Sequence, residues 1–157
     1  MTIPYRGATR DGTYFITASN FEKQSLLQSC RMANLFLEVL FHYQKKIKYN
    51  LHEFVIMPDH FHLLITPIPP VILEKSVQFI KGAFSYRAKK ELAFKGEIWQ
   101  TSFYDRRVRD ADEYARFRHY IYMNPVRRGL VTWPEEFPFS SARLRLDDVP
   151  QWLKPAA

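Results

Sequence analysis

The feature that most constrains how this chain folds is a tight β-hairpin with helical periodicity on both sides of it. Residues 51–57 form a short apolar run, residues 60–66 have the alternation of a second strand, and the turn-forming pair Pro58-Asp59 separates them. A hairpin pairs two antiparallel strands, but it needs further strands or helices to become stable. We therefore expect an antiparallel sheet of which this hairpin is one part.

The segments around the hairpin predict two helices and two more strands. In residues 24–46 and again from residue 73 to about residue 94, apolar side chains recur at steps of three and four, which is the period of an amphipathic helix. Residues 14–19 are rich in β-formers and predict a strand before the first helix. Residues 98–109 predict a strand after the second helix.

The resulting order is β-α-β-β-α-β followed by a third helix. Two helices on one face of an antiparallel sheet make an α+β fold with the ferredoxin-like layout. Asp110 or Asp112 is expected to cap the third helix. This helix is expected to end at about Asn124, because Pro125 disfavours helical geometry in the residue before it.

Length and composition are those of one ordinary globular domain. The chain has 157 residues, of which 46% are hydrophobic and 25% charged, and this excludes the disordered and collagen-like classes. We expect a single domain over residues 1–157, with a core over about 12–131 and an irregular tail over 132–157.

The sequence favours a cytoplasmic location with no membrane partner. Its single cysteine, Cys30, allows no internal disulfide and is expected to be buried as a small apolar residue. No apolar run approaches the roughly 18–20 residues of a membrane span. The first residues, Met1 to Arg6, lack the apolar stretch of a signal peptide.

Positive charge is concentrated in one part of the chain. The formal net charge is +7, and residues 81–128 hold 12 basic and 6 acidic side chains. Aromatic residues are interleaved with these cations, a pattern typical of proteins that bind single-stranded nucleic acid. The alternative is a solvated helix face next to core aromatics.

His60-Phe61-His62 lies on a predicted strand, where successive side chains point to opposite faces. Both imidazoles therefore point the same way, and Phe61 points into the other layer. Two imidazoles one strand repeat apart can hold one metal ion. The alternative is a pair of hydrogen-bonded surface histidines.

Tyr120 and Asn124 are four residues apart on the third predicted helix and so share one of its faces. Tyrosine offers a hydroxyl nucleophile, and asparagine offers a neutral oxygen ligand. Two imidazoles and one amide oxygen leave positions around Mg²⁺ or Mn²⁺ for water and phosphate oxygens, so the ion could act as a Lewis acid on a phosphodiester. Arg116 and Arg127 are candidates to activate the phenol. The alternative for Tyr120 is a half-buried helix aromatic.

Other reaction classes fit the sequence less well. It contains no Gly-rich phosphate loop, no Gly-x-Ser-x-Gly elbow and no His-Glu-x-x-His motif. A carboxylate metal site built from Asp59, Asp105 and Asp110 is disfavoured, because these residues flank turns and strand ends where Asp is common for backbone reasons.

Two motifs resemble the signatures of a known family, the REP-associated tyrosine transposases. Residues 55–65, with His60-Phe61-His62 at their centre, resemble its HUH signature of two histidines around a bulky apolar residue. Residues 119–131 resemble its second signature, a tyrosine followed four residues later by Asn-Pro-Val. Shorter matches are found at residues 14–17, 99–106 and 138–141. Asp59 and Arg128 are the small departures from the pattern.

The resemblance implies a chemistry and assigns roles in it. His60, His62 and Asn124 take the metal-ligand roles for Mg²⁺ or Mn²⁺, and Tyr120 takes the role of the nucleophile. The family cuts single-stranded DNA beside REP hairpins, forms a 5′-phosphotyrosine link and frees a 3′-hydroxyl that can rejoin strands without ATP. The resemblance further implies a prokaryotic, nucleoid-associated protein that acts as a monomer or a homodimer.

The expected DNA contacts are basic and aromatic side chains of the second half of the chain: Lys81, Arg87, Lys89, Lys90, Trp99, Arg106, Arg107, Arg109, Arg116 and Arg127. Two other functions stay open. One is a nonenzymatic nucleic-acid-binding module of ferredoxin-like fold. The other is an HUH nuclease of the relaxase or replication-initiator type.

Overall fold

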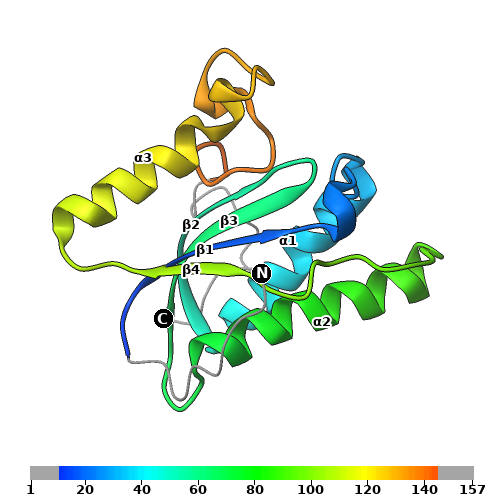
Figure 1. Cartoon of the computed structure of the whole chain (residues 1–157), viewed down its shortest axis with the longest axis horizontal. Helices are drawn as coiled ribbons and strands as arrows, with labels where there is room; N and C mark the ends of the chain where they lie inside the picture. Colours follow the sequence, from blue (N-terminus) through cyan, green and yellow to red (C-terminus); the bar gives the residue numbers. More distant parts are fainter. Residues whose placement is uncertain (1–10, 145–157) are drawn as a thin grey trace.

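The computed structural model describes residues 11–144 (Figure 1). Its elements follow in the order β1 (Tyr14–Ser19), the short 3-10 helix η1 (Phe21–Lys23), α1 (Cys30–Lys45), β2 (Tyr49–Ile56), β3 (His60–Pro67), α2 (Leu73–Glu91), β4 (Tyr104–Arg107), α3 (Ala111–Arg127) and the 3-10 helix η2 (Pro134–Glu136). The predicted β-α-β-β-α-β order with a third helix is therefore confirmed.

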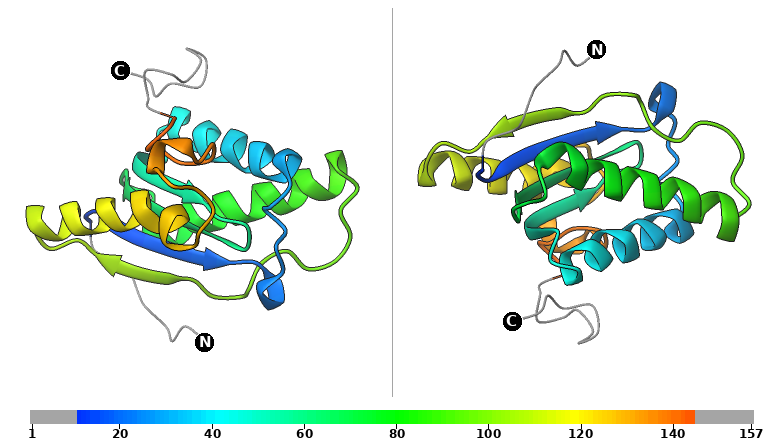
Figure 2. Two further views of the ribbon diagram at one scale, coloured as in Figure 1. Left: turned by 90° about the horizontal axis from the view of Figure 1, so that it is seen from above. Right: turned by 90° about the horizontal axis from the view of Figure 1, so that it is seen from below.

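The four strands form one sheet in the order β2-β3-β1-β4, and each neighbouring pair is antiparallel. The helices α1 and α2 cover one face of this sheet, and α3 lies across the other face (Figure 2). This is the ferredoxin-like layout that the sequence predicts. The sheet thus has one helical layer on each side, and the two layers contain different kinds of residues.

Strand alternation divides the interior into two cores. Ile16 of β1 and Phe61 of β3 point toward α1 and α2 and join the larger core. Phe15 and Leu64 point the other way and pack with Ile121 of α3 in a smaller core. Because this second core is small, there is room beside it for polar side chains between the sheet and α3.

The first helix begins later than its periodicity predicts. It starts at Cys30 rather than near residue 24, because Ser29 accepts a hydrogen bond from the Met32 amide 3.1 Å away and caps it there. Before it, Glu22 and Lys23 of η1 take positive φ angles and Gln24 is extended, so η1 does not continue into an α-helix. Cys30, expected to be buried, is exposed because it lies in the first turn of the helix, on its outer side.

The strand predicted over residues 98–109 is much shorter, since only Tyr104–Arg107 pair as β4. Ile98 and Trp99 turn into the larger core, where they are 2% and 9% exposed. Their backbone makes one isolated bridge to Asn20 beyond the end of β1. Because these two large side chains are buried in the core, the segment that holds them does not continue the pairing of β4 with β1.

The helix α3 passes through Pro125 instead of ending at Asn124. Asp110 is its N-cap and accepts a hydrogen bond from the Glu113 amide at 2.8 Å. Pro125 has no amide hydrogen to donate to the carbonyl of Ile121, and α3 ends two residues later, at Arg127. By contrast, α2 ends earlier than predicted, at Glu91, where positive φ at Ala93 reverses the chain.

The described part of the tail is tied to the sheet. The amide of Ile56 donates to the carbonyl of Phe139 at 2.8 Å. The amide of Ser141 donates to the carbonyl of Phe54 at 2.9 Å. Residues 139–141 thus extend the outer edge of β2. From residue 145 onward, the expected tail over 132–157 lies outside the described residues. The segment from Met1 to Arg6 lies outside them too. Within residues 11–144, no helix is both long and apolar enough to cross a membrane.

Candidate active site

His60 and His62 lie on β3 and point to the face of the sheet that α3 covers. Their ring centroids are 4.8 Å apart, and the two residues are 5% and 4% exposed. Phe61 points the other way and packs against Phe36 and Trp99. The structure therefore places both imidazoles in one layer, as strand alternation predicts.

Each imidazole is held through its Nδ1 atom. Nδ1 of His60 lies 2.6 Å from Oδ1 of Asp59. Nδ1 of His62 lies 2.7 Å from the hydroxyl of Thr17, its register partner on β1. Partners of this kind orient the rings of metal-binding histidines and leave Nε2 for the metal.

Burial favours the neutral form of both rings. Desolvation, with smaller contributions from His60 and from nearby arginine charges, lowers the pKa of His62 to about 3. Desolvation also lowers the pKa of His60, although its hydrogen bond to the Asp59 carboxylate opposes this shift. Burial alone would raise the pKa of Asp59, but its hydrogen bond and charge interaction with His60 lower it overall. The pair thus carries the lone pairs that a metal ligand requires.

Asn124 approaches the histidines from α3. Its Nδ2 atom lies 3.3 Å from Nε2 of His62, and the residue is 3% exposed. Among the described residues, its Oδ1 is a buried oxygen with no hydrogen-bond partner. A buried amide oxygen normally has a partner, so this oxygen, on a side chain that contacts the His62 ring, fits the third ligand of a cation.

No group of three or more His, Cys, Asp or Glu in residues 11–144 could hold a metal ion. The carboxylate alternative is therefore not supported: Asp59 bonds to His60 and Asp110 caps α3. A cation at this site would have two imidazoles and one amide as its protein ligands.

Tyr120 lies one helical turn before Asn124 and faces the same histidine. Its ring centroid is 5.2 Å from that of His62 and 5.8 Å from that of Phe15. The guanidinium of Arg127 stacks over the Tyr120 ring at 4.1 Å. Tyr120 is 40% exposed, so its side chain is open to solvent.

A buried carboxylate fixes the helix that carries Tyr120. Glu53 on β2 accepts hydrogen bonds from Tyr122 at 3.1 Å and from Ser141 at 2.6 Å. Nε of Arg118 lies 3.2 Å from the same carboxylate. Glu53 therefore joins β2, α3 and the tail at one point, with Ile121 buried in the small core beside it.

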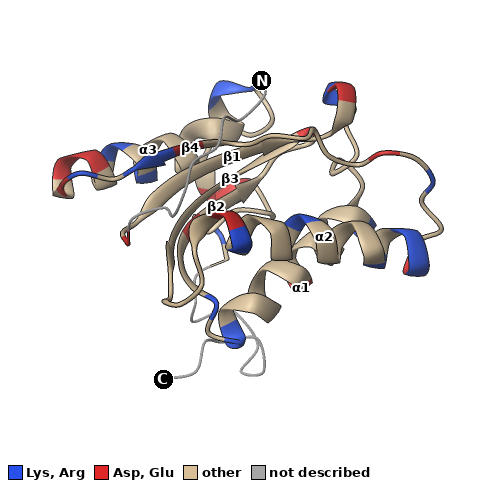
Figure 3. Ribbon diagram, turned by 60° about the horizontal axis from the view of Figure 1, so that its bottom comes forward, with Lys and Arg blue, Asp and Glu red and all other residues tan. Residues whose placement is uncertain are grey.

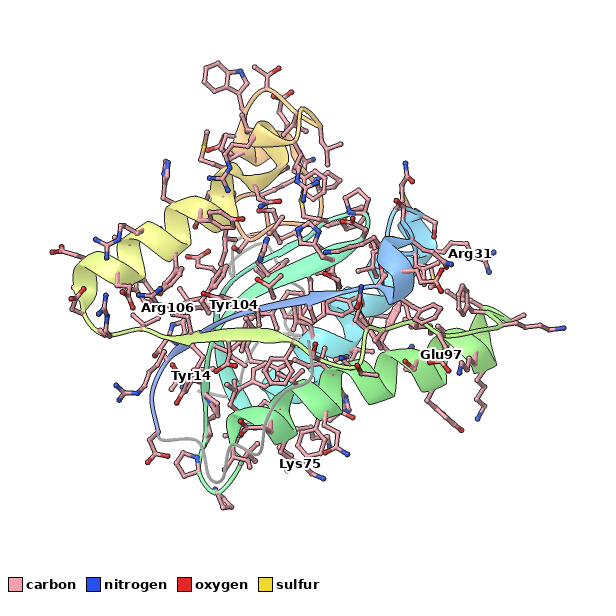
Figure 4. The ribbon with its side chains drawn as sticks, viewed as in Figure 1. Tyr14, Arg31, Lys75, Glu97, Tyr104 and Arg106 are labelled. Carbon is pink, nitrogen blue, oxygen red and sulfur yellow. The ribbon has the colours of Figure 1, made fainter. Side chains whose placement is uncertain are left out.

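Four of the predicted DNA-contact residues lie on the α3 side of the sheet. Arg106, Arg109 and Arg116 gather around Glu113, and Arg127 lies over Tyr120. Figure 4 shows Arg106 between β4 and α3. Arg107, the next residue, instead donates to the carbonyl of Asp11 at 3.2 and 3.0 Å.

The remaining predicted contacts are on the other side of the sheet, away from Tyr120. They are carried by α2: Lys81, Arg87, Lys89 and Lys90. Arg87 is paired with Glu91. Trp99 was expected to stack on bases, but it packs in the core and donates through Nε1 to the carbonyl of Lys81 at 3.1 Å. Burial of the apolar ring between the sheet and α2 disfavours base stacking by Trp99, and this contact stays a prediction.

Sequence reasoning missed Thr17, Phe15 and the role of Asp59 as the partner of His60. Phe15 stacks on His62 with centroids 5.3 Å apart. Alternation along β1 places Phe15 and Thr17 on one face, and this signal was available in the sequence. What the sequence lacked was the register of β1 against β3.

The comparisons with known sequences agree with the geometry. The chain matches the family model described as "Transposase IS200 like" over residues 12–124. It is 26% identical over 137 residues to the REP-associated tyrosine transposase of Escherichia coli (strain K12), which covers 84% of this chain and 77% of that protein. It is 31% identical over 96 residues to a putative REP-associated tyrosine transposase of Haemophilus influenzae (strain ATCC 51907 / DSM 11121 / KW20 / Rd), covering 55% of this chain and 54% of that protein.

Solved structures show the same fold. The structure of a REP-associated tyrosine transposase bound to a REP hairpin superposes with a TM-score of 0.76 at 23% identity, covering 100% of this chain and 92% of that one. The crystal structure of a putative transposase from Deinococcus radiodurans R1 gives a TM-score of 0.54 at 21% identity, with 76% and 95% covered. The predicted resemblance is confirmed, and the chain belongs to the family of IS200-like transposases.

Proposed function

We propose that this transposase cuts and rejoins single-stranded DNA beside REP-like hairpins, with Tyr120 as the nucleophile. His60, His62 and Asn124 would hold a divalent cation, Mg²⁺ or Mn²⁺. The observation that carries the proposal is that Tyr120 and Asn124, both on α3, contact His62 on β3. The Oδ1 atom of Asn124 is buried there without a hydrogen-bond partner among the described residues.

The cleavage step follows from this arrangement. A divalent cation held by His60, His62 and Asn124 would supply Lewis-acid polarisation of the scissile phosphate. The Tyr120 oxygen attacks phosphorus and its proton passes to solvent, which reaches the half-exposed side chain. The P–O3′ bond breaks, and the 3′-oxygen takes up a proton. A 5′-phosphotyrosine diester remains on the chain.

Rejoining is the reverse exchange. A 3′-hydroxyl attacks the phosphotyrosine, and the Tyr120 oxygen leaves and regains a proton. One P–O bond forms for each one that breaks, so neither step requires ATP. This agrees with the lack of a Gly-rich phosphate loop in the sequence.

Arg127 would assist both steps. Its guanidinium stacks on the Tyr120 ring at 4.1 Å and donates to the Tyr120 carbonyl at 3.3 Å. This position holds the ring against His62 and puts a positive charge where negative charge develops on the phenol and the phosphate.

The names of the relatives support a hairpin substrate. The Escherichia coli relative is named a REP-associated tyrosine transposase, and the solved neighbour was bound to a REP hairpin. The contact between Tyr120 and His62 lies within one chain, which supports a site that is complete in a monomer. A DNA substrate also supports action at the nucleoid.

The test is covalent trapping on DNA. The probe is a labelled single strand that carries the inverted repeat nearest the gene, incubated with Mn²⁺ or Mg²⁺ and run on a denaturing gel. We expect an adduct that chelation prevents and that Tyr120→Phe abolishes. The matched control is Tyr86→Phe, which removes a hydroxyl from an exposed tyrosine of α2, on the other side of the sheet.

An adduct that persists in Tyr120→Phe would contradict the assignment of the nucleophile. Binding of the hairpin without any adduct or metal dependence would favour the nonenzymatic module instead. Cleavage of unstructured strands in preference to the hairpin would favour the relaxase type of HUH nuclease.

A further inference from the structure

Three arginine side chains converge on one buried carboxylate at the start of α3. Oε2 of Glu113 lies 2.8 Å from Nη2 of Arg109. The Nη2 atoms of Arg106 and Arg116 lie 3.6 and 3.8 Å from the same oxygen. The Glu113 side chain is 4% exposed, whereas those of Arg106, Arg109 and Arg116 are 47%, 66% and 69% exposed. The carboxylate therefore gathers these cations, which we call the arginine cluster, and leaves their outer sides in water.

The charge of the arginine cluster suits a phosphate. Asp110 caps α3 through the Glu113 amide and adds a second carboxylate near Arg109. Three guanidinium groups thus stand against two carboxylates, so the group stays positive. Figure 3 shows this mixture of acidic and basic residues at the start of α3. Planar guanidinium groups bind phosphate oxygens through paired N–H donors.

A small apolar pocket adjoins the arginine cluster. It has a volume of about 230 Å³ and is lined by Phe15, Arg116, Phe117 and Tyr120. The rings of Phe15 and Phe117 stack with centroids 4.6 Å apart and planes at 9°. This volume is below the roughly 300–1,000 Å³ of a site for a drug-sized ligand and suits one planar ring. Arg116 belongs to both the pocket and the arginine cluster.

We propose that the pocket and the arginine cluster together bind one nucleotide of the unpaired strand, next to the phosphodiester that is cut. Its base stacks in the pocket and its phosphate lies on the arginine cluster. The inference rests on the proposed function, because it takes Tyr120 as the nucleophile. Any occupant of the pocket touches Tyr120, so in a DNA strand it must be close to the phosphate that Tyr120 attacks.

Two features of β4 support a nucleotide as the occupant. Tyr104 is 50% exposed and meets Phe15 edge to face at 6.4 Å, which provides a further ring beside the pocket. Figure 4 shows Tyr104 and Arg106 on the side of β4 toward α3. An apolar, ring-lined pocket and a cationic group in contact with each other match the base and the phosphate of one nucleotide.

The test measures hairpin binding by fluorescence anisotropy in a Tyr120→Phe background. This substitution keeps the ring that lines the pocket and removes the hydroxyl, so the DNA stays intact. The probe is the hairpin from the gene-flanking inverted repeat with its unpaired flank. One probe series carries a single abasic site at each flank position, and a second carries a single neutral methylphosphonate at each flank phosphate.

We expect one abasic position to weaken binding about tenfold, as the loss of one stacked base does. Phe117→Leu should reduce this penalty while keeping the site apolar. One neighbouring methylphosphonate should weaken binding several-fold, and Arg116→Ala should remove that penalty. The control is Lys75→Ala, which removes a cation from the first turn of α2, on the other side of the sheet from the pocket. It should leave both penalties unchanged.

Penalties spread evenly along the flank, or penalties that neither Phe117→Leu nor Arg116→Ala changes, would overturn the nucleotide site. Such a result would leave the proposed function standing, because the hairpin would still bind. Failure to bind any hairpin probe, together with no adduct on wild-type protein, would instead count against the proposed function itself.

Discussion

The rings of Tyr120 and His62 meet edge to face, with centroids 5.2 Å apart and planes at 80°. One ring comes from the α3 helix and the other from the β3 strand, so their distance depends on how α3 docks on the sheet. Residues that orient His62 or fix α3 should therefore control the chemistry without touching DNA.

Thr17→Val should weaken metal binding with little change in shape. The hydroxyl of Thr17 holds Nδ1 of His62 at 2.7 Å, and loss of such a partner lowers metal affinity by about 10–100-fold. Titration calorimetry with Mn²⁺ measures the effect. Thr17→Ser keeps a hydroxyl and should bind nearly as well as the wild type. Thr13→Val, which loses a hydroxyl bonded to Thr66 instead, is the matched control. Unchanged Mn²⁺ affinity in Thr17→Val would contradict a role for this hydroxyl.

Asn124→Leu should abolish stabilisation by Mn²⁺ and leave the metal-free protein about as stable as the wild type. The amide buries an unpaired Oδ1, and its Nδ2 makes one long hydrogen bond, at 3.3 Å, to Nε2 of His62, so an apolar side chain of similar size should cost about 1 kcal/mol. Thermal unfolding with and without Mn²⁺ checks this, because a ligand that binds only the folded chain raises its melting temperature. A loss of more than about 2 kcal/mol without metal would show that the amide is structural instead.

Glu53→Ala should loosen α3 and the tail together. It removes the acceptor of the Tyr122 hydroxyl and one of the two acceptors of the Ser141 hydroxyl, and a buried polar group left unsatisfied costs about 1–3 kcal/mol. Urea unfolding should show this loss, and adduct formation should slow because Tyr120 is held less firmly. Glu38→Ala is the control, since Glu38 is an exposed carboxylate that lies 3.6 Å from Arg87. Equal stability of the two variants would argue against an anchoring role for Glu53.

Glu113→Gln should lower stability at neutral pH but not in acid. Hydrogen bonds from Arg109 hold the pKa of the Glu113 carboxyl below its ordinary value of 4.5. The ionised group therefore stabilises the fold above that pH, and the contribution disappears as pH falls through the lower folded-state pKa. Melting temperatures of wild type and variant should differ at pH 7 and converge as the pH falls below the lowered pKa of Glu113.

The exposed Glu97 provides the control for this titration, because Glu97→Gln changes the same charge on the loop after α2. It should give a small difference from wild type at every pH. A gap between Glu113→Gln and wild type that stays constant as the pH falls below the lowered pKa of Glu113 would mean that the carboxylate charge contributes nothing to the fold.

The sequence by itself determined the features that depend on local periodicity. Alternation along β3 put His60 and His62 on one face, and helical spacing put Tyr120 and Asn124 on another. The hairpin and the two amphipathic stretches around it then left the ferredoxin-like sheet as the simplest arrangement. Each of these inferences uses residues only a few positions apart.

The tertiary structure decided which of these faces meet. Docking of α3 brought Asn124 to His62, strand register brought Thr17 to the same ring, and core packing withdrew Trp99 from the surface. The arginine cluster likewise exists because β4 lies beside the start of α3. Such contacts join segments far apart in the chain, and their free energy comes from burial and hydrogen bonding between elements, which periodicity within one element does not encode.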